Sequence, residues 1–359
     1  MSMKTNLSSR RGFLGVAGAT LATPFLSACG GDTSGTSISP SASVTTTPRI
    51  VATGAATAST SASSGVNISA TGAATTSLTG TLNSLTTTTL SRLSALTWTK
   101  AIGAALNGTG FKQTFETTFS TQDALRKITV AGAGGPWYAP IHATSGAARF
   151  ASPMDPVSPF AIVDGKLRIR AEQVNGVWQT GHMQTCDFAG SGFAQRRGYF
   201  EIRCKMPAKG TMGAWPAFWL YSKAFYTDTT KPKAEIDVIE FYPGEDSRGH
   251  HSTIHLRPPA TPTADNLLVN NWSVGCYKGL DTIGDGQWHT HGVKITDQWI
   301  IIYYDRVEYK RIPLLPEFDV PMYMLVTLQL LPDEAATAVG PIDMFVDYVR
   351  AWQISPDRY

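Results

Sequence analysis

Aromatic residues, cysteine and nearly all charge are missing from residues 30–97 of this 359-residue chain. The segment contains no Phe, Trp, Tyr or Cys, and its charged residues are Asp32, Arg49 and Arg92. Serine, threonine, alanine and glycine dominate it, and this composition buries too little apolar surface to offset the entropy of ordering the chain. We therefore expect a disordered tether at residues 29–107 and a folded domain at residues 108–359.

The chain also lacks a meaningful excess of one charge. Its 30 basic residues outnumber its 27 acidic residues only because Lys4, Arg10 and Arg11 lie in the first 28 residues. Without that segment the two numbers are equal, so the remaining chain is formally neutral. A nucleic-acid-binding protein needs a basic surface that neutralises phosphates. We therefore expect no nucleic-acid partner, and a neutral substrate such as a glycan fits this composition.

The N-terminus has the features of an export signal. A twin-arginine pattern at residues 9–14 leads into an apolar stretch at residues 14–26, which is too short to span a bilayer as a permanent helix. The sequence then runs Leu-Ser-Ala-Cys29, which resembles a bacterial lipobox whose cleavage leaves a lipidated cysteine. We expect residues 1–28 to be removed and Cys29 to anchor the protein to the bacterial cell envelope, in the periplasm or at the outer membrane. An ordinary cleaved signal, which would release a soluble protein, is the alternative.

Cysteine is scarce, and no C-x-x-C pattern typical of a zinc site is present. If Cys29 carries lipid, then Cys186, Cys204 and Cys276 remain, which permits one disulfide at most. Cys186 and Cys204 lie on consecutive expected strands. We therefore expect these two to pair in an oxidising compartment.

The expected domain at residues 108–359 contains no long run of apolar residues with a helical period. Short alternating or apolar runs recur instead, with turn residues between them. Asp164 and Gly165 separate two such runs and predict a hairpin, and a second turn is expected at Asp305 and Arg306. The pattern predicts an all-β fold, an antiparallel β-sandwich of the jelly-roll type.

The most informative motif is Glu-Ile-Asp-Val-Ile-Glu at residues 235–240. Its β-branched residues favour a strand, on which Glu235 and Asp237 share one face. Glu240 is out of phase by one residue, and a β-bulge near residues 238–239 would return it to that face. Three carboxylates on one face repel one another, so a fold keeps them where their chemistry is used; a solvated edge strand is the alternative. Two carboxyl groups about 5–5.5 Å apart are what a retaining glycosidase needs.

Four motifs resemble glycoside hydrolase family 16, the laminarinase and lichenase group, whose bulged signature is E-x-D-x-x-E. They lie at residues 199–207, 215–219, 235–240 and 345–352, and the similarity extends from about residue 111 to residue 354. The resemblance implies a concanavalin A-like sandwich with a concave substrate groove. It also implies that Glu235 is the nucleophile and Glu240 the general acid/base, and that Asp237 hydrogen-bonds the nucleophile.

Further residues are candidates for substrate contact. Trp215 and Trp219 lie four apart on one strand face and could form a platform under sugar rings, although one of them is expected to be a core residue; Trp215 is favoured as the contact. The resemblance places Glu201 and Arg203 at sugars beyond the cleavage site, and a surface ion pair is the alternative. The remaining candidates are His255, Gln329 and Trp137.

We expect catalysis to need no cofactor. The histidines do not supply the three well-placed ligands of a catalytic zinc. Members of the resembled family often bind a structural calcium through an aspartate of the last strand, and Asp347 matches that position. Calcium takes six to eight oxygen ligands, so a single carboxylate is weak support for such a site.

These features predict an exported, lipid-anchored, monomeric endo-glycosidase that binds a polysaccharide. It would hydrolyse internal β-glycosidic bonds of a β-glucan or an exopolysaccharide, with retention of configuration. A lectin-like lipoprotein would not need Glu235 and Glu240 together. A transglycosylase would use the same residues, so the sequence leaves this alternative open.

Overall fold

The computed structural model describes most of the domain and parts of the N-terminal region. The described residues are 50–51, 58–61, 67–70, 93, 96–100, 103–130, 135–139, 146–244, 246–261, 271–280 and 282–354. The expected signal at residues 1–28 and the lipidation site Cys29 lie outside them. No helix among the described residues is long and apolar enough to cross a membrane.

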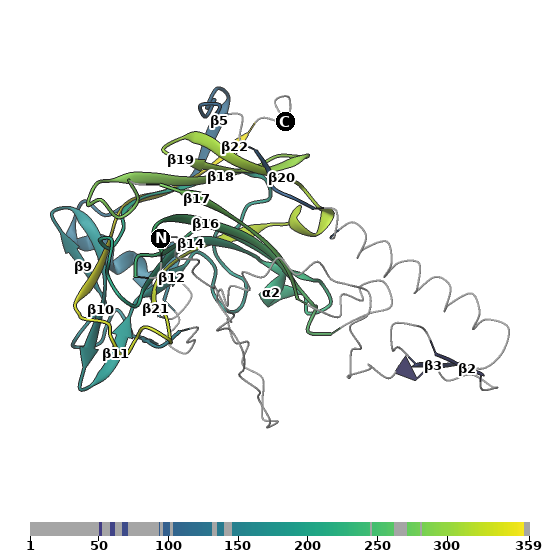
Figure 1. The fold of residues 1–359 in the computed structure, drawn as a ribbon, viewed down its shortest axis with the longest axis horizontal. Helices are drawn as coiled ribbons and strands as arrows, with labels where there is room; N and C mark the ends of the chain where they lie inside the picture. Colours follow the sequence, from purple (N-terminus) through teal and green to yellow (C-terminus); the bar gives the residue numbers. More distant parts are fainter. Residues whose placement is uncertain are drawn as a thin grey trace, which may run out of the picture.

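Two β-sheets packed face to face make up the domain, and Figure 1 shows them one above the other. The lower sheet has eight strands in the order β17, β16, β15, β14, β21, β12, β7, β6. Its strands are β6 (Ile128–Thr129), β7 (Trp137–Tyr138), β12 (His182–Gln184), β14 (Ala214–Ser222), β15 (Lys233–Tyr242), β16 (Asp246–Arg257), β17 (Trp272–Gly279) and β21 (Met322–Leu330). Neighbours are antiparallel except β6 and β7, which run parallel.

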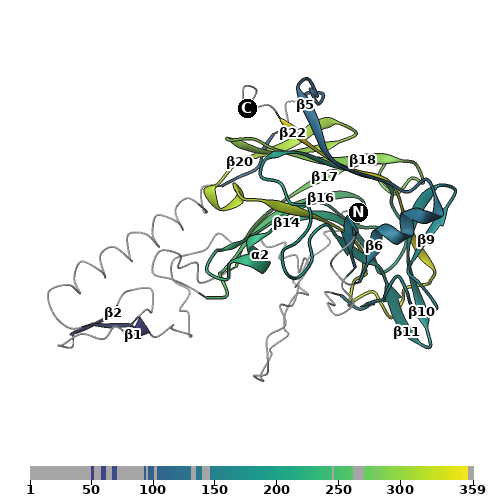
Figure 2. The same cartoon turned by 180° about the vertical axis from the view of Figure 1, so that it is seen from behind.

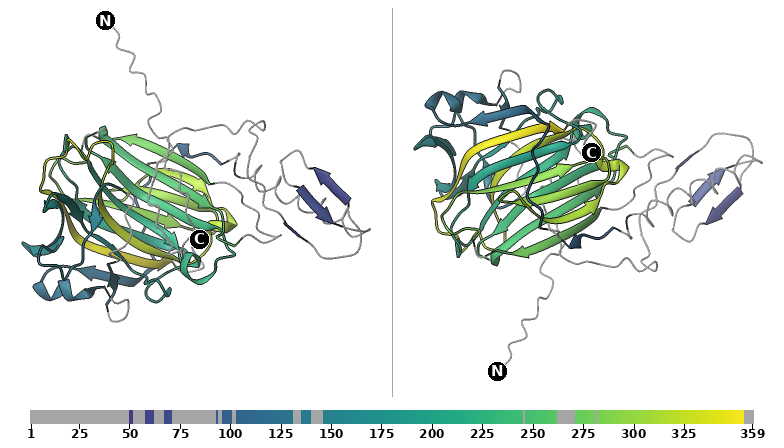
Figure 3. Two further views of the ribbon diagram at one scale, coloured as in Figure 1. Left: turned by 90° about the horizontal axis from the view of Figure 1, so that it is seen from below. Right: turned by 90° about the horizontal axis from the view of Figure 1, so that it is seen from above.

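The upper sheet has eleven strands. Nine of them lie side by side in the spatial order β4, β20, β19, β18, β13, β22, β10, β11, β8. In addition, β5 pairs with β22, and β9 pairs with β10. Its strands are β4 (Thr99–Lys100), β5 (Phe111–Thr118), β8 (Arg149–Phe150), β9 (Phe160–Val163), β10 (Lys166–Val174), β11 (Val177–Thr180), β13 (Gly198–Lys205), β18 (His289–Ile295), β19 (Trp299–Tyr304), β20 (Val307–Pro313) and β22 (Ile342–Ile354). Figure 3 shows the strands side by side across the domain, and the expected all-β sandwich is confirmed.

Three short helical segments lie among the described residues of the domain. These are η1 (Gln122–Lys127), α2 (Ala224–Thr227) and η2 (Pro316–Phe318). Both expected hairpins are present. Asp164 and Gly165 join β9 to β10 with φ of 50° and 70°, and Asp305 and Arg306 join β19 to β20 with φ of 47° and 60°. Positive φ at both central residues is the twist that two-residue hairpins require.

The main hydrophobic core lies between the sheets, and strand alternation decides which side chains enter it. On β14, the side chains of Phe218 and Leu220 belong to the core, whereas Trp219 and Tyr221 belong to a separate cluster. That second cluster lies on the face of the eight-stranded sheet turned away from the other sheet, which we call the open face. The open face is the concave side of the curved strands, and α2 lies beneath it in both Figure 1 and Figure 2.

The domain starts earlier in the chain than residue 108. Leu93 and Leu96 are buried in the main core, and the Trp98 indole N–H donates to the Val274 carbonyl at 3.1 Å. Strand β4 adds to β20 at the sheet edge. The segment expected to be a tether also contains a three-stranded sheet of β1 (Ile50–Val51), β2 (Ala58–Ser61) and β3 (Asn67–Ala70). Leu93 and Leu96 therefore attach the end of this segment to the domain.

Candidate active site

The expected bulge is present in β15, the strand that carries the three acids. Its pairing with β14 shifts between Asp237 and Ile239, and its pairing with β16 shifts between Asp237 and Glu240. Val238 and Ile239 are consecutive in sequence, yet both side chains belong to the core between the sheets. The extra residue restores the phase, so Glu235, Asp237 and Glu240 all lie on the open face, where each is buried.

Glu235 is bound by a cation that the sequence motif does not contain. Arg257, on the adjacent strand β16, donates from Nε to one carboxylate oxygen at 3.0 Å and from an Nη2 nitrogen to the other at 3.2 Å. Burial raises the pKa of Glu235, and the charge of Asp237 raises it further, whereas Arg257 and His255 oppose the shift. Such a two-point ion pair fixes both the charge and the orientation of the carboxylate.

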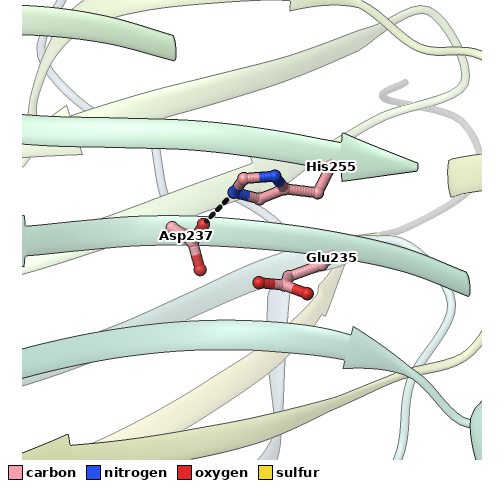
Figure 4. Close-up of side chains that lie close together, drawn as sticks. All are labelled: Glu235, Asp237 and His255. Carbon is pink, nitrogen blue, oxygen red and sulfur yellow. Dashed lines mark ion pairs between the residues drawn. The ribbon is translucent and has the colours of Figure 1, made fainter. Parts of the chain in front are cut away.

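Asp237 is partnered by His255 of β16, which pairs with Glu235 in the strand register and so lies diagonal to Asp237. The His255 Nε2 atom is 3.0 Å from an Asp237 carboxylate oxygen. Figure 4 shows this ion pair beside Glu235. Burial opposes protonation of the imidazole, but the hydrogen bond to Asp237 and the charge of Glu235 outweigh it, and the pKa of His255 is raised above its ordinary value. His255 therefore gains its positive charge beside the acids more readily than a free imidazole does.

Glu240 has neutral hydrogen-bond donors instead of a cation. The Trp215 indole N–H and the Tyr242 hydroxyl donate to the same oxygen, Oε1, at 3.0 Å and 2.7 Å. Burial and the charge of Asp237 raise the pKa of Glu240 to about 7. With Oε1 accepting two hydrogen bonds, the proton of the neutral acid resides on Oε2. A buried carboxylic acid that holds its proton near neutral pH is suited to general acid catalysis.

The charges of the site balance without an added ion. Arg257 and protonated His255 offset Glu235 and Asp237, while Glu240 is neutral when protonated. Ligand atoms of Glu235, Asp237 and His255 lie within 4.8 Å of one another, a set that could in principle hold a divalent cation. Arg257 already binds both oxygens of Glu235, so a metal at this position would have to compete with a guanidinium.

A further hydrogen-bonded chain extends across the open face from Trp219. Its indole N–H donates to the Thr327 hydroxyl at 3.1 Å, and that hydroxyl lies 2.8 Å from Nδ1 of His182. Trp219 is 1 % exposed and packs edge-on against Tyr221. Both expected tryptophans thus lie on the open face, where Trp219 is packed among neighbours and Trp215 binds Glu240 directly.

Glu201 and Arg203 are not part of this site, which corrects the expectation that they contact sugars. Both belong to β13 in the eleven-stranded sheet. The Glu201 carboxylate is buried and accepts hydrogen bonds from Arg306 at 2.9 and 3.0 Å, from Tyr199 and from Tyr348. Arg203 forms an ion pair with Asp347. The alternative, a surface ion pair, is also not what the structure shows: each residue is ion-paired with a different partner, and Glu201 is buried.

The surroundings of Asp347 do not suit calcium. Its two carboxylate oxygens are bound by Lys166 and by Arg203, and the Arg203 guanidinium lies over the Trp288 ring. These cations lower the pKa of Asp347 against the effect of burial. Two positive side chains occupy the place that a divalent cation would need, so the residues present do not fit the metal expected from the resemblance.

Two other candidates for substrate contact have structural roles. Trp137 is 1 % exposed and belongs to the core between the sheets, where it meets Phe115 edge-on. Gln329 lies on the open face, but its amide binds the backbone of Ala148 in both directions, at 3.0 and 3.1 Å. It therefore holds residues 146–148 against β21 rather than presenting a free amide. These positions correct the expectation for Trp137 and explain the burial of Gln329.

The expected disulfide is absent, which is a second correction. Cys186 and Cys204 are both buried free thiols. Cys186 follows β12 and belongs to the open-face cluster, whereas Cys204 on β13 points into the core between the sheets. Although their strands are consecutive in sequence, they belong to different sheets, and each thiol faces a different apolar environment.

Sequence reasoning missed Arg257 and Tyr242, although period-two alternation contains both. Arg257 lies two residues after His255, and Tyr242 lies two residues after Glu240. Each therefore shares a strand face with a candidate site residue. Thr327 is two residues before Gln329 by the same rule. His182 has no comparable signal, because β12 is only three residues long.

Comparison with known proteins finds similarity to one enzyme family. Residues 159–314 match the model of Glycosyl hydrolases family 16. Two proteins of Rhizobium meliloti (strain 1021), named endo-1,3-1,4-beta-glycanases EglC and ExsH, are each 32 % identical to the chain over 216 residues. The alignments cover 57 % of this chain and 42 % of each relative, so the chain spans less than half the length of these relatives.

Solved structures agree on the fold. The laminarinase catalytic domain from Thermotoga maritima MSB8 superposes with a TM-score of 0.51 at 20 % identity, covering 68 % of this chain and 98 % of that one. The non-specific endo-beta-1,3(4)-glucanase SCLam gives a TM-score of 0.53 at 20 % identity, covering 71 % and 95 %. The match at residues 159–314 therefore shows similarity to glycoside hydrolase family 16 over part of the chain, and these solved structures agree with it in fold.

Proposed function

We propose that the protein is a retaining endo-glycosidase that hydrolyses internal β-glycosidic bonds of a β-glucan or an exopolysaccharide by double displacement. The observation that carries this proposal is the convergence of Glu235, Asp237 and Glu240 on one face, with different partners for each. The names of the two Rhizobium meliloti relatives support a β-glycan as the substrate class.

In the first step, Glu240 donates the Oε2 proton to the glycosidic oxygen while Glu235 attacks the anomeric carbon. The bond from the anomeric carbon to the leaving oxygen breaks, and an ester between the sugar and Glu235 forms. Arg257 opposes the rise that burial imposes on the pKa of Glu235, and so favours its ionised form before the attack. The raised pKa of Glu240 keeps its proton available until the leaving oxygen accepts it.

In the second step, the Glu240 carboxylate removes a proton from water, and the resulting hydroxide oxygen bonds to the anomeric carbon. The ester bond breaks and returns the electron pair to Glu235. Arg257 favours this step because it binds the carboxylate more strongly than the neutral ester. Two inversions at the anomeric carbon give net retention.

Stereochemistry and variants test the proposal. The first-formed reducing end should have the β configuration when it is followed by proton NMR during hydrolysis. Glu235→Ala should abolish turnover. Glu240→Ala should spare the first step for substrates with activated leaving groups and should yield a β-glycosyl azide when azide is added, because azide needs no general base. Asp237→Asn should be milder than either variant.

Two results would contradict the proposal. Near-normal turnover by Glu235→Ala would eliminate the glycosidase mechanism and leave a glycan-binding protein as the better reading. An α-configured first product would eliminate retention. Transfer of the glycosyl group to sugar hydroxyls in preference to water would identify a transglycosylase that uses the same residues.

We also propose that the protein is exported and held at the cell envelope by lipid on Cys29, as a monomer. The support is the order of the twin-arginine and lipobox patterns at the N-terminus. Cys29→Ala should move the protein from membrane fractions to soluble fractions while its catalysis is retained. Wild-type protein recovered entirely in the soluble periplasm would refute the anchor.

A further inference from the structure

The bulge in β15 is supported from behind by one serine. Ser252 on β16 lies between Thr253, which pairs with Asp237, and His251, which pairs with Glu240. It is therefore the single residue opposite the two bulge residues of β15. Its buried hydroxyl donates to the Val238 carbonyl at 2.8 Å. A bulge disrupts the regular ladder, and this side chain supplies a donor to a carbonyl at the disruption.

Ser252 is the end of a buried polar chain that crosses the core to the other sheet. The Tyr309 hydroxyl, from β20, contacts Ser252 Oγ and lies 2.6 Å from Nδ1 of His250. Nε2 of His250 lies 3.1 Å from Nδ1 of His291 on β18. All four side chains are buried, and the surrounding core is apolar. Buried polar groups of this kind are costly unless each finds a partner.

Counting protons gives these four side chains one consistent direction, with the Cys276 thiol as a further partner of the Tyr309 hydroxyl. The Val238 carbonyl can only accept, so the one proton of Ser252 is donated there, and Ser252 must accept from Tyr309. Tyr309 then accepts from Nδ1–H of His250, whose Nε2 accepts from Nδ1–H of His291. Burial lowers the pKa of His291 to about 3, which keeps that ring neutral, as this assignment requires. Among the described residues, Nε2 of His291 has no hydrogen-bond partner, so the chain ends there.

We propose that this chain, from His291 through His250 and Tyr309 to Ser252, positions the β15 bulge and through it the carboxyl group of Glu240. The proposal rests on the proposed function, in which Glu240 is the general acid. Glu240 is only two residues from Val238, and the bulge alone brings it to the open face. A strand without the bulge would turn Glu240 into the core, because side chains alternate with a period of two.

Strand β14 pairs with the bulge through Phe218 and Ile239, but the open-face side-chain contacts of Glu240 do not fix the backbone there, so the side-chain support comes from behind. Trp215 and Tyr242 bind the carboxyl oxygen, not the peptide groups of Val238 and Ile239. A displacement of about 1 Å at a catalytic group can lower the rate by up to about 100-fold. Ser252 and Tyr309 are therefore positioning residues, and their loss should affect proton donation more than substrate binding.

The test compares Ser252→Ala, Ser252→Thr and Tyr309→Phe with wild type and with Glu240→Ala. Each is assayed on the polysaccharide and on a dinitrophenyl glycoside of an oligosaccharide from it, whose leaving group needs little proton donation. Ser222→Ala is the matched control. Ser222 is a buried serine of β14 whose hydroxyl accepts from the Ala234 N–H. Ala234 lies on β15, the strand that carries the bulge, but near its start.

The expected result is specific to the reaction step. Ser252→Ala should lower kcat on the polysaccharide by roughly 10- to 100-fold with KM within about twofold, and should lower the rate on the dinitrophenyl glycoside much less. Tyr309→Phe should have the same pattern with a smaller loss, and Ser252→Thr should recover most of the rate. Ser222→Ala should keep kcat even if its Tm falls as much as that of Ser252→Ala.

Three results would overturn the proposal. The first is a wild-type kcat in Ser252→Ala, and the second is an equal loss of rate by Ser252→Ala on the polysaccharide and on the dinitrophenyl glycoside. The third is a kcat loss in Ser222→Ala that equals the loss in Ser252→Ala when both variants have the same Tm. In each case Glu240→Ala, by sparing the dinitrophenyl glycoside, would show that the proposed function itself still stands. Equal losses on both substrates in Glu240→Ala would instead remove the role of Glu240, and the positioning proposal with it.

Discussion

Replacing Glu240 with glutamine should stabilise the folded domain at alkaline pH while it removes the proposed acid. The fold holds the Glu240 proton more tightly than an unfolded chain does, since burial and Asp237 raise its pKa from 4.5 to about 7. The carboxyl group therefore contributes its full stability at pH values below the unfolded pKa. This contribution is lost as the pH rises through the folded value, because a buried negative charge must then form.

The size of the effect follows from the shift. A difference of this size corresponds to roughly 3 kcal/mol of unfolding free energy that wild type loses above neutral pH. Glutamine resembles the protonated acid, keeps an oxygen that can accept from Trp215 and Tyr242, and cannot ionise. The free energy of unfolding of Glu240→Gln should therefore exceed that of wild type by roughly 3 kcal/mol near pH 8.5, and should match it near pH 4.

Urea denaturation of both proteins at the two pH values measures this difference. Glu201→Gln is a matched control, because Glu201 is an equally buried glutamate on the opposite sheet that is paired with Arg306. Glu201→Gln should lower the free energy of unfolding by about 1–3 kcal/mol and should not raise it at either pH. The lower end of this range is expected because the Arg306 side chain is half exposed, and solvent weakens the ion pair. A Glu240→Gln protein that is no more stable than wild type near pH 8.5, or equally stabilised at both pH values, would refute the reasoning.

Three further predictions concern other charged or reactive groups. Arg257→Ala should raise the pKa of Glu235 and move the acidic limb of the kcat/KM profile upward by about 1–3 pH units, whereas an unmoved limb would show that Arg257 does not control its ionisation. Cys186 and Cys204 should both be alkylated when the unreduced protein is denatured, and mass mapping that finds them linked would contradict the structure. The Tm difference between wild type and Asp347→Asn should be the same in EDTA and in calcium chloride, because Lys166 and Arg203 already neutralise the Asp347 carboxylate. A Tm difference that appears only in calcium chloride would support a calcium site at Asp347.

The parts of the fold that depend on local pattern could be predicted from the sequence. The bulge followed from the phase of Glu240 relative to Glu235, since a period of two allows no other way to gather the acids. The hairpin at Asp164 followed from turn chemistry that operates over two residues. In each case the cause lies within a few positions of the effect.

The errors share a different cause, which is sheet membership. The sequence of β13 is typical of a strand that lines a groove, because polar Glu201 and Arg203 alternate with apolar residues. Alternation does not indicate which of the two sheets a strand joins. The disulfide between Cys186 and Cys204 failed for the same reason, since consecutive strands entered different sheets. For Trp137 the strand is two residues long, so the choice between core and open face was set by contacts with residues distant in sequence.

The charge of the partner, not the depth of burial, separates the roles of the buried acids. Acids across the structure are paired with cations: Glu201 with Arg306, Glu308 with Arg311, Asp319 with Arg196 and Arg197, Asp347 with Lys166 and Arg203, and Glu235 with Arg257. Glu240 is as buried as the glutamates of this set, but its hydrogen-bond donors are the neutral indole of Trp215 and hydroxyl of Tyr242. A cation beside a carboxylate favours ionisation, and that suits a nucleophile or a structural ion pair. Neutral donors orient a carboxyl group without cancelling the cost of its charge, so the proton stays on Glu240, where the proposed first step requires it.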